Sequence, residues 1–298
     1  MKRVPKVLIF EQGTMIKSFA SLIGREVLSI GVPTNNPEHF QTIEMDVHLP
    51  SQKLIDHYIY WSGAGIFPYS KQVPPHLFFQ LVMPHCIEQL KQTRYSLTRI
   101  VNLGCAMKIY SPIQYNAAIK AQICIKRLKE SMGRARIVQH IDIFANKKLA
   151  LELEIHTLLP TETVEANTPP AKTTDKQPQA DFTELGVWQA QPWDGGDFAL
   201  LTGDFNPIHW SNLAGKRSAF GSKVLHGFGT FVRSFELLQA NLNRAVKHID
   251  VRFTAPLQLP GGENILSHQN DDPKRVAIPL QLADHQNRLL MSGNYRIV

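Results

Sequence analysis

The sequence lacks any hydrophobic run that could cross a membrane. None reaches the roughly 18 to 20 apolar residues that a bilayer requires, and the longest, around residues 77–83, is bracketed by prolines. Residues 1–13 contain no apolar segment followed by a small-residue cleavage site, as a secretory signal would. We therefore expect a cytoplasmic protein that has no membrane partner.

Cysteine is scarce as well. The chain has only Cys86, Cys105 and Cys124, which are far apart and set among apolar residues. An odd number without metal-ligand spacing indicates reduced core residues rather than a disulfide framework or a zinc site.

Blocks of like charge are also missing. The 32 Lys and Arg residues exceed the 25 Asp and Glu residues and give a net charge of +7, but the cations are scattered. There is no basic stripe with interleaved aromatic residues, so a nucleic-acid partner is not expected. The basic excess fits a phosphorylated small ligand or simply a soluble surface. A hydrophobic content of 43% is enough for a full core.

One segment divides the chain. Residues 160–181 are rich in Pro, Thr, Ala and charge and contain one large aliphatic residue. Such a composition cannot bury enough surface to offset its ordering entropy, so this segment is predicted to be a flexible linker. The predicted domains are therefore 1–159 and 182–298.

The two predicted domains share one pattern. A short helical stretch ends in Ser62-Gly63-Ala64 in the first and in Thr202-Gly203-Asp204 in the second. A longer apolar helix follows, over about 75–90 and 227–241, and then segments that alternate with period two. Matching strand segments, 108–114 and 252–258, are predicted between them.

This order predicts an α+β fold made of two copies of one unit. In each copy a long apolar helix would lie across one face of a curved antiparallel sheet. The two sheets are expected to pair edge to edge, which would remove exposed strand edges.

The second copy holds the residues best suited to chemistry. Asp204 and His209 lie five residues apart in Thr-Gly-Asp-Phe-Asn-Pro-Ile-His, where Pro207 fixes a turn and Asn206 suits an Asx turn. A carboxylate and an imidazole held this way form an acid–base pair. Gly227 opens the long helix, whose first amides lack internal partners and can stabilise an oxyanion.

Thr202–His209 followed by Val-Leu-His-Gly at 224–227 resembles the MaoC-like family of (R)-specific enoyl-CoA hydratases, including the hydratase unit of multifunctional β-oxidation enzymes. The resemblance covers about 183–298 and implies a double hotdog fold, with a degenerate first half. It also implies that Asp204 and His209 activate a water molecule, that Asn206 supports the loop, and that the Gly227 amide binds the thioester oxygen. The implied reaction is reversible hydration of a trans-2-enoyl thioester to the (R)-3-hydroxyacyl thioester, with no metal and no redox cofactor.

The first copy has lost these parts. Ala64 stands where Asp204 stands in the second copy, and ten residues that would carry Asn-Pro-x-His are missing before His76. The glycine of the second helix start is replaced by Leu77. One active site per chain is expected, with the first half forming a wall of the acyl tunnel or only completing the fold.

Several residues near the active loop are candidates for substrate binding. They are the cations Lys216, Arg217 and Lys223 for a phosphate, Phe205 and Phe228 for the acyl group, and His226 beside the helix start. Each could equally be an ordinary surface or core residue.

The expected substrate is an acyl-CoA or acyl carrier protein (ACP) thioester, and the chain is a possible homodimer. Two other functions stay open, because hotdog folds host several activities. One is an acyl-CoA thioesterase, and the other is a non-catalytic acyl-thioester-binding subunit.

Overall fold

Strand β3 (Ile119–Ser131) illustrates how the alternating pattern builds a sheet. Ile119, Ala121 and Ile123 are buried, whereas Lys120 and Gln122 between them are exposed. The computed structural model describes residues 3–28, 31–65, 67–161, 178, 181–269 and 276–297. The predicted linker falls almost entirely outside these residues.

The described chain forms two compact units. The C-terminal unit comprises the described residues of Met1–Glu11, Ser51–Ser70 and Pro170–Val298, and the N-terminal unit those of Gln12–Pro50 and Lys71–Pro169. Two early segments thus group with the C-terminal unit, which the boundaries read from the sequence did not anticipate. The assignment of 1–159 as degenerate and 182–298 as catalytic stays a prediction.

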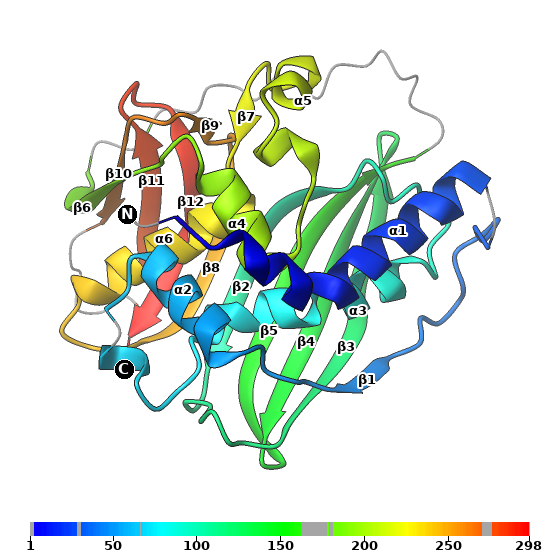
Figure 1. Cartoon of the computed structure of the whole chain (residues 1–298), viewed down its shortest axis with the longest axis horizontal. Helices are drawn as coiled ribbons and strands as arrows, with labels where there is room; N and C mark the ends of the chain where they lie inside the picture. Colours follow the sequence, from blue (N-terminus) through cyan, green and yellow to red (C-terminus); the bar gives the residue numbers. More distant parts are fainter. Residues whose placement is uncertain are drawn as a thin grey trace. The chain divides into compact units, whose positions relative to one another are not determined.

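The N-terminal unit is an antiparallel sheet with two helices on one face (Figure 1). Its strands follow the order β1-β3-β4-β5-β2. They are β1 (Ile43–Asp46), β3, β4 (Arg134–Ala145), β5 (Lys148–Pro160) and β2 (Val101–Ile109). Helix α3 (Phe78–Leu90), preceded by the 3-10 turn η3 (Pro75–Leu77), packs on β3, and α1 (Gly13–Leu28) packs on α3.

The C-terminal unit repeats this arrangement. Its sheet has the order β8-β12-β11-β10-β6, and α6 (Gly227–Ala240) lies across it (Figure 1). The strands are β8 (Val246–Phe253), β12 (Leu289–Ile297), β11 (Ile278–Asp284), β10 (Glu263–His268) and β6 (Thr183–Gln189). A separate two-stranded ladder joins β7 (Lys223–Val224) to β9 (Gln258–Leu259).

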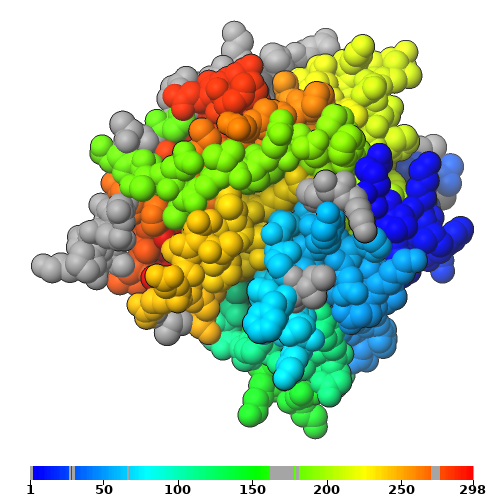
Figure 2. Space-filling model, turned by 60° about the vertical axis from the view of Figure 1, so that its left-hand side comes forward, coloured from blue at the N-terminus to red at the C-terminus, as the bar shows by residue number. Residues whose placement is uncertain are grey.

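Short helices complete the C-terminal unit. They are η1 (Lys6–Gln12), which runs to the start of α1, α2 (Gln52–Ser62), η2 (Phe67–Tyr69), α4 (Asp194–Thr202), η4 (Pro207–His209) and α5 (Asn212–Arg217). Helix α2 packs against both α4 and α6. In Figure 2, β6 runs as a green band along the gold α6, and the light-blue α2 lies beside α6.

Most of the predicted elements are present. Both long helices are confirmed, as is the α+β class. The strands predicted over 108–114 and 252–258 are wrong in their extent, because β2 ends at Ile109 and β8 at Phe253. In each case a proline follows three residues later, which cannot donate to a ladder. Within the described ranges, no helix is both long and apolar enough to span a bilayer.

Candidate active site

The loop after α4 positions the predicted acid. Helix α4 ends at Gly203, which adopts the left-handed conformation with φ of 81°. The Asp204 amide donates to the Thr202 hydroxyl at 3.4 Å. The Asn206 side chain then accepts a hydrogen bond from the Ile208 amide at 3.3 Å and caps η4. The Asx turn expected at Asn206 is therefore present.

The first copy has the same loop geometry without the acid. Helix α2 ends at Gly63, with φ of 88°, and the Ala64 amide donates to the Ser62 hydroxyl at 3.2 Å. The backbone that presents Asp204 is thus duplicated at Ala64. Since a methyl group cannot exchange a proton, this copy of the loop has no acid–base group at that position.

His209 is held in a defined tautomer. Its Nδ1 lies 2.8 Å from the Val224 carbonyl oxygen, which can only accept, so Nδ1 carries the hydrogen and Nε2 carries the lone pair. Helix α4 also packs closely against the His209 backbone. A Cβ built on Gly195 of α4 would lie 2.0 Å from the His209 carbonyl oxygen. Only glycine allows α4 to approach the histidine this closely.

His226 stacks on His209 and joins the loop to α6. The two ring centroids are 3.6 Å apart with an interplanar angle of 23°. The Nε2 of His226 donates to the Asp204 carbonyl oxygen at 3.0 Å. Its Nδ1 is buried and has no hydrogen-bond partner among the described residues. His226 therefore connects the acid, the second imidazole and the start of the long helix.

Asp204, His209 and His226 form one group. Each offers a potential ligand atom within 4.8 Å of the others, and the Asp204 side chain is 34% exposed whereas both histidines are buried. A set with this spacing could also hold a metal ion. One nitrogen of each imidazole is already committed to a backbone carbonyl oxygen, which leaves each ring a single lone pair for a proton or an ion.

Burial keeps both histidines neutral. Desolvation lowers the pKa of His209 below its usual value, although the Asp204 carboxylate and the Val224 carbonyl oppose the shift. The pKa of His226 falls to about 3, mainly through burial and secondly through the nearby His209. A neutral His209 can accept a proton at neutral pH, as a general base must.

The His226 shift predicts acid-sensitive folding. Its folded pKa of about 3 lies below the ordinary value of 6.5, so the unfolded chain binds more protons between these values. The free energy of unfolding should fall by up to about 1.4 kcal/mol per pH unit as the pH drops below about 6.5. Thermal melts from pH 7 to 4 measure this slope. His226→Gln, which keeps a donor for the Asp204 carbonyl, should flatten it, and an unchanged slope would contradict the assignment.

Helix α6 directs its amino end at this group. His226 is the N-cap, its side chain makes no capping bond, and Gly227 is the first helical residue. The opening amides of a helix lack internal partners and favour negative charge. Gly227 also permits close packing, since a Cβ there would lie 2.7 Å from the Phe253 ring.

Gly227→Ala is expected to destabilise the C-terminal unit. The added methyl group must displace the Phe253 ring, and overpacking of this kind costs about 1 to 3 kcal/mol. Thermal unfolding would register the loss. Phe253→Leu in the same chain should recover part of it by vacating the space, and a failure to recover would show that Phe253 is not the obstacle.

A buried ion pair beneath the site was not predicted from the sequence. Arg233 of α6 contacts both carboxylate oxygens of Asp194 at 2.7 and 2.9 Å and lies over the Trp61 ring at 4.3 Å. Trp61 packs on Phe198, and Phe198 packs on His226, with centroid distances of 4.7 and 5.0 Å. In the sequence, this ion pair is indicated by Arg233 alone, a single cation in the middle of an apolar helix.

The predicted substrate-binding residues fall into two sets. Phe228 is buried at the start of α6, and Phe205, which directly follows Asp204, is half-buried. Lys216 and Arg217 are exposed on the last turn of α5. In the described chain neither cation has a hydrogen bond or ion pair with Asp204, His209 or His226.

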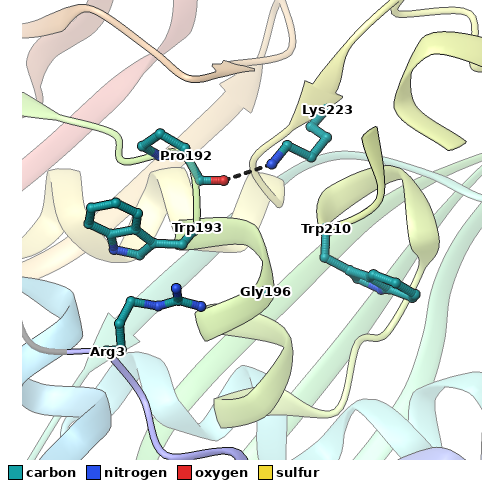
Figure 3. Close-up of a pocket in the computed structure, with 6 residues that line it drawn as sticks. All are labelled: Arg3, Pro192, Trp193, Gly196, Trp210 and Lys223. Carbon is teal, nitrogen blue, oxygen red and sulfur yellow. Dashed lines mark hydrogen bonds between the residues drawn. The ribbon is translucent and has the colours of Figure 1, made fainter. Parts of the chain in front are cut away.

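Lys223 lines a shallow hollow of about 250 Å³ beside the loop (Figure 3). Its ammonium donates to the Pro192 carbonyl oxygen at 2.8 Å. The other lining residues are Arg3, Trp193, Gly196 and Trp210. Arg3 is itself paired with the buried Asp197 at 3.0 Å.

Comparison with known proteins gives matches both in sequence and in fold. Residues 165–262 match the model of the MaoC like domain. The 3-hydroxyacyl-thioester dehydratase X of Mycobacterium tuberculosis is 24% identical over 208 residues, which are 68% of this chain and 72% of that protein. Its crystal structure superposes with a TM-score of 0.68 at 19% identity, covering 87% of this chain and all of the other.

Two further solved structures share the fold. A MaoC-like dehydratase from Phytophthora capsici has a TM-score of 0.70 at 13% identity and covers 88% of this chain and 96% of its own. A Mycobacterium tuberculosis protein described as having a double hotdog fold has a TM-score of 0.59 at 12% identity, with coverages of 90% and 99%. The predicted double hotdog class is therefore confirmed. Pairing of the two sheets edge to edge stays a prediction.

Proposed function

We propose that the chain is a MaoC-like hydratase or dehydratase that reversibly hydrates trans-2-enoyl thioesters to (R)-3-hydroxyacyl thioesters. The match of residues 165–262 to the MaoC like domain and the double hotdog fold support this proposal. The observation that carries the proposal is the grouping of Asp204 with His209 and His226 at the amino end of α6. The related protein of Mycobacterium tuberculosis is named as a 3-hydroxyacyl-thioester dehydratase, which is the reverse direction of this reaction.

Asp204 and His209 act on the water molecule. Neutral His209 takes a proton from water through Nε2, since its Nδ1–H is committed to the Val224 carbonyl. Asp204, which is partly exposed, orients the same water by accepting a hydrogen bond. The oxygen adds to C3 of the enoyl group and the proton is returned to C2, so one water molecule is added in total. Asn206 holds the loop that carries both groups.

The start of α6 stabilises the intermediate. Attack at C3 moves negative charge onto the thioester oxygen, and in this proposal the Gly227 amide donates a hydrogen bond to it. The position of Gly227 as the first residue of α6 supports this role. His226 holds Asp204 through its backbone and His209 through ring stacking. Phe228 and Phe205 contribute apolar surface for the acyl group.

One site per chain is proposed, in the C-terminal unit. Ala64 occupies the loop position of the acid in the first copy, and Leu77 replaces the helix-start glycine. We further propose a cytoplasmic location and a possible homodimer. Lys223, Lys216 and Arg217 are proposed to meet the anionic carrier of the acyl group.

The test is an assay of crotonyl-CoA with chiral analysis of the product. We expect loss of the enoyl absorbance and formation of (R)-3-hydroxybutyryl-CoA. Free thiol measured in the same reaction distinguishes the thioesterase alternative, which would release CoA. Binding of enoyl-CoA without hydration or thiol release would favour the non-catalytic alternative, and an (S) product would overturn the stereochemical assignment.

A further inference from the structure

A surface of mixed basic and apolar character borders the catalytic loop. We define the α5 surface as Trp210, Leu213, Lys216, Arg217, Phe220 and Lys223. Its apolar members are exposed, at 48% for Trp210, 60% for Leu213 and 37% for Phe220. Leu213, Lys216 and Arg217 follow i, i+3, i+4 spacing and so share one face of α5. The yellow α5 and β7 segment is part of the visible surface in Figure 2.

The segments that frame this surface contain no acid. No Asp or Glu occurs in 205–235, in 186–193 or in 251–262. These segments touch one another, because Lys223 donates to Pro192 and β7 pairs with β9. The Lys216 and Arg217 side chains make no hydrogen bond or ion pair with any described residue. Their charge is therefore not neutralised within the described C-terminal unit, and it favours an acidic partner.

The α5 surface is linked to the proposed catalytic residues by chain adjacency and by hydrogen bonds. Trp210 directly follows His209, and its Nε1 donates to the Phe205 carbonyl oxygen at 3.0 Å. Lys223 directly precedes Val224, whose carbonyl oxygen holds His209. Helix α5 packs against both η4 and β7. A partner seated on α5 would therefore lie next to the loop that carries Asp204 and His209.

The geometry points to the α5 surface as a docking site for an acidic carrier protein that presents the acyl group as a thioester on a pantetheine arm. This inference rests on the proposed function and names its partner. A CoA nucleotide could use the cations and one indole ring, but it would leave Leu213 and Phe220 uncovered. A protein helix bearing carboxylates around apolar side chains complements both features, as rim charges and buried anchors do at protein interfaces.

The experiment compares one enoyl group on three carriers. Wild-type protein and Lys216→Glu/Arg217→Glu are assayed with crotonyl thioesters of a bacterial acyl carrier protein, of CoA and of pantetheine. The control is Lys53→Glu/Arg244→Glu, which makes the same charge change at exposed residues of the C-terminal unit outside the α5 surface. Fluorescence anisotropy of labelled carrier protein measures binding independently of turnover.

We expect the α5 double variant to lower kcat/KM for the carrier-protein thioester by about tenfold or more, mainly through KM, and to weaken binding in parallel. Turnover of the pantetheine thioester should stay within about twofold of wild type. Equal loss with CoA and carrier protein would assign the surface to a nucleotide and overturn the inference. The inference would also be overturned if the α5 double variant bound the carrier protein as tightly as wild type. An equal loss of kcat/KM in the Lys53→Glu/Arg244→Glu control would overturn it as well. A wild type that hydrates no thioester would instead refute the proposed function, while the anisotropy still decides the docking.

Discussion

Asp204→Asn should lower kcat for enoyl-thioester hydration by about 10²- to 10⁴-fold, the usual contribution of a positioned acid–base group. Asparagine keeps the shape and the loop hydrogen bonds of aspartate but lacks the carboxylate that orients and polarises water. His209→Ala should cause a loss of similar size, because no other described imidazole carries the Nε2 lone pair at that point. Initial rates with crotonyl-CoA measure both, and circular dichroism checks that the fold is retained.

Ala64→Ser is the matched control, since Ala64 occupies the same loop position in the first copy. It should leave the rate within about twofold of wild type, as surface changes remote from chemistry do. If it proved as damaging as Asp204→Asn, the one-site assignment would fail. A fully active Asp204→Asn protein would remove the acid–base assignment itself.

Arg233→Met should lower the free energy of unfolding by about 3 to 5 kcal/mol, which is typical when one member of a buried ion pair is removed. The side chains of Arg233 and Asp194 are 5% and 1% exposed. Burial lowers the pKa of Arg233 and the Asp194 carboxylate opposes that shift, so the pair compensates a large desolvation penalty. The variant leaves Asp194 charged and buried without its partner. Urea denaturation measures the change.

Arg233→Met/Asp194→Asn provides the corresponding test of pairing. Asparagine removes the unpaired charge, and its carbonyl oxygen can still accept the Gln191 amide that now donates to Asp194 at 2.6 Å. The double variant should therefore be more stable than Arg233→Met alone. If the loss of unfolding free energy in the double variant equals the sum of the losses in Arg233→Met and Asp194→Asn, the destabilisation does not arise from an uncompensated carboxylate.

The loop that carries Asp204 and His209 was predictable because its determinants are local. Gly203 ends a helix, Asn206 caps the next turn and Pro207 restricts the residue before it, so a short window of sequence specifies the geometry. The long helices were predictable for the same reason, since each is a continuous apolar segment. Helix α1 was missed because its apolar residues occupy two sides, with Met15 and Leu22 buried but Ile16 and Ile23 exposed.

The contacts that support the site could not be predicted. The Val224 carbonyl that sets the His209 tautomer is a backbone atom, and any residue type would supply it. Trp61 and Arg233 are separated by 172 positions, and no local pattern specifies such a pair. The polar groups of the candidate site could therefore be predicted from local sequence, whereas the buried residues that support them depend on long-range packing.

The C-terminal unit includes segments from the beginning of the chain, among them α2. Trp61 supplies one face of the Arg233 guanidinium, Tyr69 donates to the buried Glu236 at 2.6 Å, and Arg3 meets Asp197. A gene fragment encoding only 182–298 would omit all three contributors. Such a fragment would lack side chains that pack inside the C-terminal unit, so we expect it to be less stable than the same residues within the whole chain.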